Sequence, residues 1–157
     1  MRLPRASAVV STVFGIGCFP QAQGTVMSAV ALPLAILLAL HGGYIVLLGA
    51  SIVVLVIGIL ACADYVRVTG NPDPSECVID ELAGQWLASA FVAFGTLSLP
   101  AFFLSFVLFR LFDIWKPGPV SWAENNLKGG LGVMMDDIVA GLMAGILAGA
   151  VHYMGWL

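Results

Sequence analysis

Long stretches without a charged side chain are the feature that most limits how this chain can fold. No Asp, Glu, Lys or Arg occurs between Arg5 and Asp64, within residues 82–109, or within residues 138–157. A helix needs about 20 consecutive apolar residues to cross the hydrocarbon core of a bilayer. Hydrophobic residues make up 61% of the chain and charged residues only 10%, against roughly 25% charged in soluble domains. The chain is therefore predicted to be an integral membrane protein.

The apolar stretches predict one all-α membrane domain, residues 1–157, with about three full spans plus a short helical hairpin broken near Pro100. Two spans are expected at residues 25–40 and 44–63, joined by a tight turn at His41–Gly43, and the third at 138–157. The segments show no strong alternation of apolar and polar residues, which favours helices over the strands of a barrel.

Residues 82–109 fit either one span or two short helices, about 82–96 and 101–110, folded back near Pro100. Proline has no N–H to donate and disfavours helix at the residue before it, which favours a break. The hairpin also places all six Lys and Arg residues on one side of the membrane, as expected of the cytoplasmic side. A single span would divide them three and three. We therefore predict the hairpin.

Other features of the composition exclude several classes of protein. The net charge of −3 is too small to indicate a nucleic-acid partner. Cys18, Cys62 and Cys77 are odd in number and lack CxxC spacing, so neither a disulfide framework nor a zinc site is indicated. The N-terminus has the basic start and short apolar core of a secretion signal. Gly15 stands where a lipoprotein cleavage site would carry an aliphatic residue, and we expect no cleavage.

The first charged cluster places carboxylates at the start of the hairpin. A turn at Asn71–Pro74 predicts that a helix begins near Ser75. Glu76 and Asp80 would then share a helix face at i,i+4, with Glu81 beside them. Acids in a first helical turn complement the helix dipole, which would explain Glu76. Asp80 and Glu81 are expected farther inside the helix, where a functional role is favoured.

The second charged cluster begins with RLFDIWKPGP, residues 110–119. Arg110, Asp113 and Lys116 repeat at i, i+3 and i+6, on roughly one side of a helix that Pro117 ends. Arg110 and Lys116 suit phosphate binding, the first by a bidentate fork and the second as a point charge. The alternative is an interfacial salt bridge with snorkelling side chains.

The segment KGGLGVMMDD, residues 128–137, combines glycines with two acids. Gly129, Gly130 and Gly132 leave backbone amides accessible, and such a loop before a helix can receive an oxyanion. Glycines before a membrane helix also often make only a turn. Asp136 and Asp137 are expected to open the last helix, where dipole complementarity explains one of them but not both.

These clusters predict a site for a metal and a phosphate on one membrane face. Hard oxygen ligands suit Mg²⁺, which keeps several waters and is completed by a substrate phosphate. The metal would polarise the phosphorus and activate a water, with one carboxylate as general base. A lipid phosphate would keep its acyl chains in the bilayer. The catalytic residues of this metal-assisted hydrolysis are expected to be Asp80, Glu81, Asp113, Asp136 and Asp137.

Four segments of the chain resemble the phosphatidylglycerophosphatase A family. They are FGIGCFPQAQGT (14–25), VIDELAGQW (78–86), RLFDIWKPGPVSW (110–122) and KGGLGVMMDDIVAG (128–141). The resemblance implies removal of the terminal phosphate from phosphatidylglycerophosphate, giving phosphatidylglycerol, with Mg²⁺ as cofactor. It also implies a multi-pass protein of the bacterial inner membrane whose active site faces the cytoplasm.

The same resemblance assigns roles to particular residues. Asp73 stands where family members often carry an aspartate, and Met27 stands where they commonly carry a glycine, in GTVMS for GTxGS. A methionine at this position would hinder another group from approaching the backbone closely at this loop, next to Gly24. The metal ligands implied are Asp80, Glu81, Asp136 and Asp137. The residues expected to bind substrate phosphate are Arg110, Lys116, Lys128, Gly129, Gly130 and Thr25. Which carboxylate is ligand and which is general base does not follow.

Rival functions are less favoured by the sequence. The chain lacks a DxDGT-like nucleophile motif and an SGH signature, and Cys62 precedes Arg67 by one residue too few for Cys-x5-Arg. Direct attack by water, without a covalent phospho-enzyme, is therefore expected. The alternative is a small membrane transporter or ion-pathway protein that uses the same acids, although these acids flank the spans. The sequence leaves open the oligomeric state, the number of metals and the head-group selectivity.

Overall fold

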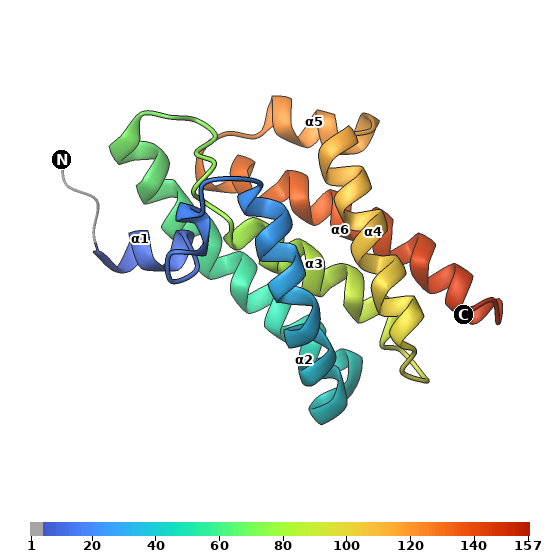
Figure 1. The fold of residues 1–157 in the computed structure, drawn as a ribbon. Helices are drawn as coiled ribbons and strands as arrows, with labels where there is room; N and C mark the ends of the chain where they lie inside the picture. The colour runs from blue at the N-terminus through green and yellow to red at the C-terminus, as the bar shows by residue number, and fades with distance from the viewer. Residues whose placement is uncertain (1–4) are drawn as a thin grey trace.

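The computed structural model describes residues 5–157 and is helical in all its regular elements, which confirms the predicted all-α class (Figure 1). Arg2, one of the six basic residues, lies outside the described residues. The elements are α1 (Arg5–Ser11), the 3-10 helix η1 (Ile16–Cys18), α2 (Gln23–Thr69), α3 (Ile79–Val92), α4 (Leu99–Trp115), α5 (Gly118–Asn126) and α6 (Gly129–Tyr153).

The long element α2 consists of two helical arms joined at Gly43. The φ and ψ of Gly43 are 64° and −163°, which are not helical, and glycine reaches positive φ without a Cβ penalty. Figure 1 shows that the chain reverses direction there. Ala39 and Leu47, on either side of the bend, are buried in one apolar cluster. The turn predicted at His41–Gly43 is confirmed.

The helices α3 and α4 form the predicted hairpin. Helix α3 ends at Val92 and α4 begins at Leu99, with Pro100 in its first turn. Ser98 caps α4 by accepting a hydrogen bond from the Ala101 N–H. Proline is favoured in a first turn because its missing N–H has no helical partner to lose. The break therefore falls just before Pro100.

Contacts at the hairpin turn define the two ends of the molecule. His152 Nε2 of α6 lies 3.0 Å from Thr96 O, and the rings of Tyr44 and Phe94 lie 4.8 Å apart between centroids. The hairpin turn, the bend at Gly43 and the end of α6 therefore share one end. Both charged clusters lie at the other end, which we call the charged end, as the hairpin predicts.

Two helices, α2 and α6, are long and apolar enough to cross a membrane. Because α2 bends, its two arms and α6 overlap the three spans predicted from the sequence, with α6 starting earlier, at Gly129. Their crossing of a bilayer remains a prediction. The outer faces of the bundle support it, because large apolar side chains there are more than half exposed. Examples are Leu40, Ile45, Leu60, Phe103 and Ile146.

Tags placed at both ends of the bundle would test this arrangement in a membrane. We expect reporters inserted after Gly70 and at Asn125 to give the same side, because both positions lie at the charged end. A reporter after Leu157 should give the opposite side, because Leu157 O lies 2.9 Å from His152 Nδ1 at the other end. Opposite readings at Gly70 and Asn125 would contradict the hairpin.

Candidate active site

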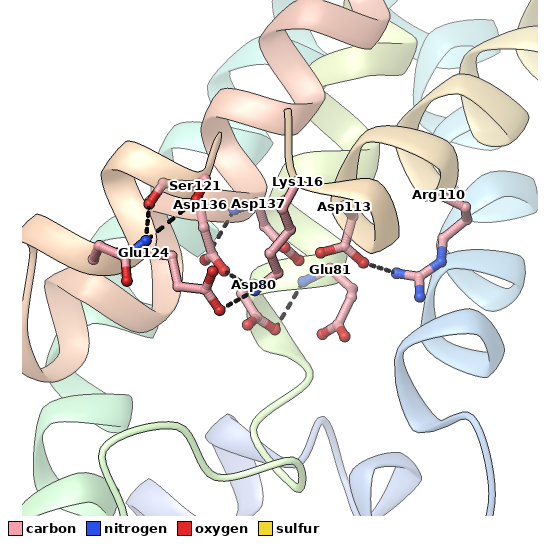
Figure 2. Close-up of polar contacts among 10 residues, drawn as sticks. Asp80, Glu81, Arg110, Asp113, Lys116, Ser121, Glu124, Asp136 and Asp137 are labelled. Carbon is pink, nitrogen blue, oxygen red and sulfur yellow. Dashed lines mark hydrogen bonds and ion pairs between the residues drawn. The ribbon is translucent and has the colours of Figure 1, made fainter. Parts of the chain in front are cut away.

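Seven charged side chains from three helices converge at the charged end (Figure 2). They line one cavity of about 220 Å³, which we call the acidic cavity. These residues are Asp80 and Glu81 from α3, Arg110 and Asp113 from α4, Lys116 just after α4, and Asp136 and Asp137 from α6. All seven were predicted as site residues, and the structure brings them together.

Asp80 and Glu81 occupy the first turn of α3, which corrects the helix start predicted near Ser75. The N–H of Val78 donates to Ser11 O at 3.0 Å, so the chain just before α3 is bound to the end of α1. Glu76 therefore precedes the helix and shares no helix face with Asp80. The dipole explanation now applies to Asp80 and Glu81 themselves. It accounts poorly for the burial of Asp80, which is only 8% exposed.

Helix α6 begins at Gly129, about two turns before Asp136 and Asp137. The prediction that these two acids open the last helix, after a glycine loop, is therefore wrong. Close packing explains the earlier start: a Cβ on Gly130 would overlap the backbone carbonyl of Ile59 in α2. The structure places Gly130 in this helix contact and not on the acidic cavity.

Asp80, Glu81 and Asp137 form the tightest group of carboxylates in the described chain. One oxygen from each lies within 4.8 Å of the others. Glu81 Oε2 and Asp137 Oδ2 are buried and have no hydrogen-bond partner among the described residues. Burying carboxylate oxygens next to one another is costly unless a cation compensates their charge. The group therefore fits a hard divalent cation that prefers oxygen ligands.

Asp136 is engaged differently from its neighbour. Its Oδ2 lies 3.2 Å from Lys116 Nζ, and its Oδ1 accepts a hydrogen bond from the Asp137 N–H. Lys116 Nζ also pairs with Glu124 at 2.6 Å. Burial lowers the pKa of Lys116, but the hydrogen bonds and charges of these two carboxylates outweigh it and raise the pKa above its usual value. Lys116 is thus a permanent cation between two acids.

Arg110 and Asp113 form an ion pair on one face of α4. Arg110 Nη1 lies 2.5 Å from Asp113 Oδ2, and both side chains are mostly buried. The sequence left an interfacial salt bridge with snorkelling side chains open as an alternative; Arg110 does form an ion pair, but a mostly buried one. Arg110 Nε is buried without a hydrogen-bond partner among the described residues. The guanidinium can therefore hold Asp113 and still donate to an anion.

The start of α2 closes one side of the acidic cavity. Gly24 lines the cavity, and a Cβ there would overlap Glu81 Oε1, so a larger residue at this position would displace the Glu81 carboxylate. Met27 is fully buried in an apolar cluster with Val78. The close backbone approach is therefore made at Gly24 and does not depend on residue 27. Thr25 is exposed and does not line the acidic cavity.

Near the acidic cavity, sequence reasoning missed helix α5 and the partner residue that it supplies, Glu124. Helix α5 was not predicted, although Pro119 in its first turn is a helix-start signal that would have found it. This helix brings Glu124 to Lys116. Asp73, from the loop before α3, also lines the acidic cavity. Lys128 and Gly129 line a neighbouring cavity instead.

The fold and the site together define a class of protein. An all-helical bundle with two candidate membrane spans carries a buried carboxylate cluster and two cationic side chains on one cavity. Such a site can hold a metal ion and a phosphate group side by side, the arrangement used for chemistry on phosphate esters.

Comparison with known proteins gives the particular family. The model of the phosphatidylglycerophosphatase A family matches residues 9–152. The chain belongs to the phosphatidylglycerophosphatase A family and is a phosphatase, which confirms the resemblance seen in its motifs.

Three relatives are similar over most of their length. Phosphatidylglycerophosphatase A of Escherichia coli (strain K12) is 34% identical over 146 residues, 90% of this chain and 79% of the relative. The Haemophilus influenzae protein of the same name is 35% identical over 141 residues, 89% of this chain and 85% of the relative. A Bacteroides thetaiotaomicron protein, named as a candidate phosphatidylinositol-3-phosphatase, is 35% identical over 142 residues, which cover 88% of this chain and 89% of the relative. No solved structure matches the chain.

Proposed function

We propose that this chain is a Mg²⁺-dependent phosphatidylglycerophosphatase. It removes the terminal phosphate of phosphatidylglycerophosphate and releases phosphatidylglycerol and inorganic phosphate. Family membership and the names of the Escherichia coli and Haemophilus influenzae relatives support the substrate. The observation that carries the metal dependence is the buried carboxylate group of Asp80, Glu81 and Asp137.

In this proposal Asp80, Glu81 and Asp137 hold the ion. Their two buried oxygens without a partner are the atoms best placed to do so. When bound, Mg²⁺ supplies stabilisation of negative charge on the phosphate and lowers the pKa of a water. Asp136, also expected as a ligand, has both oxygens engaged, by Lys116 and by the Asp137 N–H. Its role as a ligand stays a prediction.

The other side chains of the acidic cavity serve the phosphate. Arg110 lines the cavity and donates from its guanidinium, which Asp113 holds in place, and Lys116 contributes a fixed positive charge. The oxygen of a water forms a bond to phosphorus while the bond to the glycerol oxygen breaks. A carboxylate of the cavity takes one proton of the water, and this proton passes to the departing glycerol oxygen, which leaves as a hydroxyl. No covalent phospho-enzyme is formed.

We place this reaction at the cytoplasmic face of the bacterial inner membrane, in a multi-pass protein. Among the described basic residues, Arg67, Arg110, Lys116 and Lys128 belong to the charged end, which the positive-inside rule assigns to the cytoplasm. A lipid substrate could then remain in the bilayer beside the exposed apolar faces while its head group enters the acidic cavity.

Phosphate release from phosphatidylglycerophosphate by the purified protein tests the proposal. We expect release with Mg²⁺, its loss after chelation, and its recovery when Mg²⁺ is restored. Mg²⁺ should also raise the thermal stability of the protein, a readout that needs no turnover. Full activity under chelation would contradict the metal dependence. Release from phosphatidylinositol 3-phosphate alone would contradict the substrate, and ion flux without phosphate release would favour the transporter alternative.

A further inference from the structure

A second cavity of about 510 Å³ adjoins the acidic cavity. Asp73 and Asp136 line both cavities, so the two share a wall. The second cavity lies between the end of α2, the loop before α3, the end of α5 and the start of α6. We call it the Lys128 cavity, because Lys128 is the one cationic side chain that lines it among the described residues.

The structure divides four of the six predicted phosphate-binding residues between the two cavities, whereas Thr25 and Gly130 line neither. Arg110 and Lys116 line the acidic cavity, whereas Lys128 and Gly129 line the Lys128 cavity. Lys116 is bound by two carboxylates, but Lys128 forms no ion pair within residues 5–157. Two separate positions for negative groups therefore lie side by side.

The part of the Lys128 cavity wall at the start of α6 is suited to binding an anion. Three carboxylates line the cavity: Glu124 and Asp136 are both paired with Lys116, which offsets part of their charge, whereas Asp73 forms no ion pair within residues 5–157. Lys128 is the residue before α6, whose first amides have no helical partner and favour negative groups. The position of a Cβ on Gly129 would have no atom within 4 Å, so the backbone there is open.

The remaining wall of the Lys128 cavity is apolar. Val66, Leu127 and Val133 line it. Outside the cavity, α6 packs on α2 at Gly130, and nearby Leu60 and Leu131 are 68% and 42% exposed. An exposed apolar surface of this kind can continue into lipid chains. The Lys128 cavity therefore offers an anion position between the acidic cavity and an apolar exterior.

We propose that the Lys128 cavity binds the phosphodiester of the lipid head group while the terminal phosphate occupies the acidic cavity. This inference rests on the proposed function and adds a selectivity to it. The proposed substrate carries two phosphates joined by one glycerol, which matches two cation-bearing cavities that share a wall. A lipid whose single phosphate is attached directly to diacylglycerol has no group for Lys128. Lys128 is thus a specificity-determining residue.

The inference can be tested with Lys128→Ala and Lys128→Arg variants. We expect Lys128→Ala to raise the KM for phosphatidylglycerophosphate by about tenfold, the size expected for one lost charge-assisted contact, with kcat little changed. Lys128→Arg should retain most of the affinity. Hydrolysis of phosphatidic acid should not change in either variant. Arg67→Ala serves as the matched control, because Arg67 is an exposed cation paired with Asp64 and lines neither cavity.

A binding measurement gives a readout that needs no turnover. Glycerol 1,3-bisphosphate should raise the melting temperature of the wild type more than inorganic phosphate does, and Lys128→Ala should lose this difference. An equal effect of Lys128→Ala on both lipids, or no effect on either lipid and on the bisphosphate shift, would overturn the inference and leave the proposed function standing. Absence of phosphate release from phosphatidylglycerophosphate by the wild type would instead refute the proposed function.

Discussion

Asp137→Asn and Asp80→Asn are each expected to lower kcat by at least about 10²-fold, because each removes one charged oxygen donor from the proposed Mg²⁺ site. Asparagine preserves the size of the side chain and loses its charge. Asp137 is 3% exposed, and one of its oxygens has no partner in the described chain, so water cannot easily replace the lost ligand. Phosphate release at increasing Mg²⁺ concentration measures the effect.

Thermal melting separates loss of the metal from loss of the fold. Without Mg²⁺, both variants should melt at or above the temperature of the wild type, because the substitution relieves repulsion among buried carboxylates. The stabilisation by Mg²⁺ should be lost, since a ligand stabilises only the state that binds it. Asp64→Asn is the control, because Asp64 pairs with Arg67 away from the acidic cavity. If both variants were activated by Mg²⁺ as strongly as the wild type, the proposed Mg²⁺ site would be contradicted.

The bends of the fold were predictable because each has a local cause. Gly43 takes a positive φ that glycine adopts at little cost, and Pro100 stands in the first turn after the break in the apolar stretch of residues 82–109. The charge-free stretches likewise set the helices, since a charged side chain is costly in an apolar environment. These signals need no knowledge of the partners in space.

The helix starts were not predictable, because tertiary contacts decide them. Gly129 and Gly130 suggest a loop by their local preference, yet they begin α6 because Gly130 packs on the backbone of Ile59. The start of α3 at Ile79 depends on the hydrogen bond that the Val78 N–H donates to Ser11 O at the end of α1. Neither contact leaves a signal within its own segment.

The chemistry of the candidate site was predictable, but the partners of each acid were not. The sequence indicates which carboxylates and cations form the site, and that they lie at the same end of the bundle. Adjacent residues on a helix point about 100° apart, so Asp136 and Asp137 face different neighbours. Only the packing of α3, α4 and α6 shows that Asp137 joins Asp80 and Glu81 whereas Asp136 meets Lys116.

The spacing of the three carboxylates depends on a contact between backbones. A Cβ on Gly141 of α6 would overlap the carbonyl of Gly84 in α3, and a Cβ on Gly84 would lie 2.6 Å from Asp137 O. Small residues allow helices to approach this closely. Gly84 follows Asp80 by about one turn, and Gly141 follows Asp137 by about one turn. The contact therefore sets the distance between α3 and α6 at the proposed metal site.

Gly141→Ala is accordingly expected to damage both stability and activity. The added methyl meets backbone, which cannot rotate away, so we expect a loss of about 1–3 kcal/mol in stability. Displacement of α6 should lower kcat by about 10²-fold, since shifts near 1 Å in catalytic groups have effects of that size. Melting temperature, phosphate release and the Mg²⁺ concentration for half activation measure these effects.

A matched glycine distinguishes the helix contact from a general effect of alanine. Gly49 lies in α2 with no atom within 4 Å of its Cβ position, and alanine is the better helix former by about 1 kcal/mol. Gly49→Ala should therefore keep full activity and melt no lower than the wild type. If Gly141→Ala is as active as Gly49→Ala and responds equally to Mg²⁺, the close approach of α3 and α6 does not position the carboxylates. A stable Gly141→Ala variant with weakened Mg²⁺ activation would show instead that helix spacing controls the metal site directly.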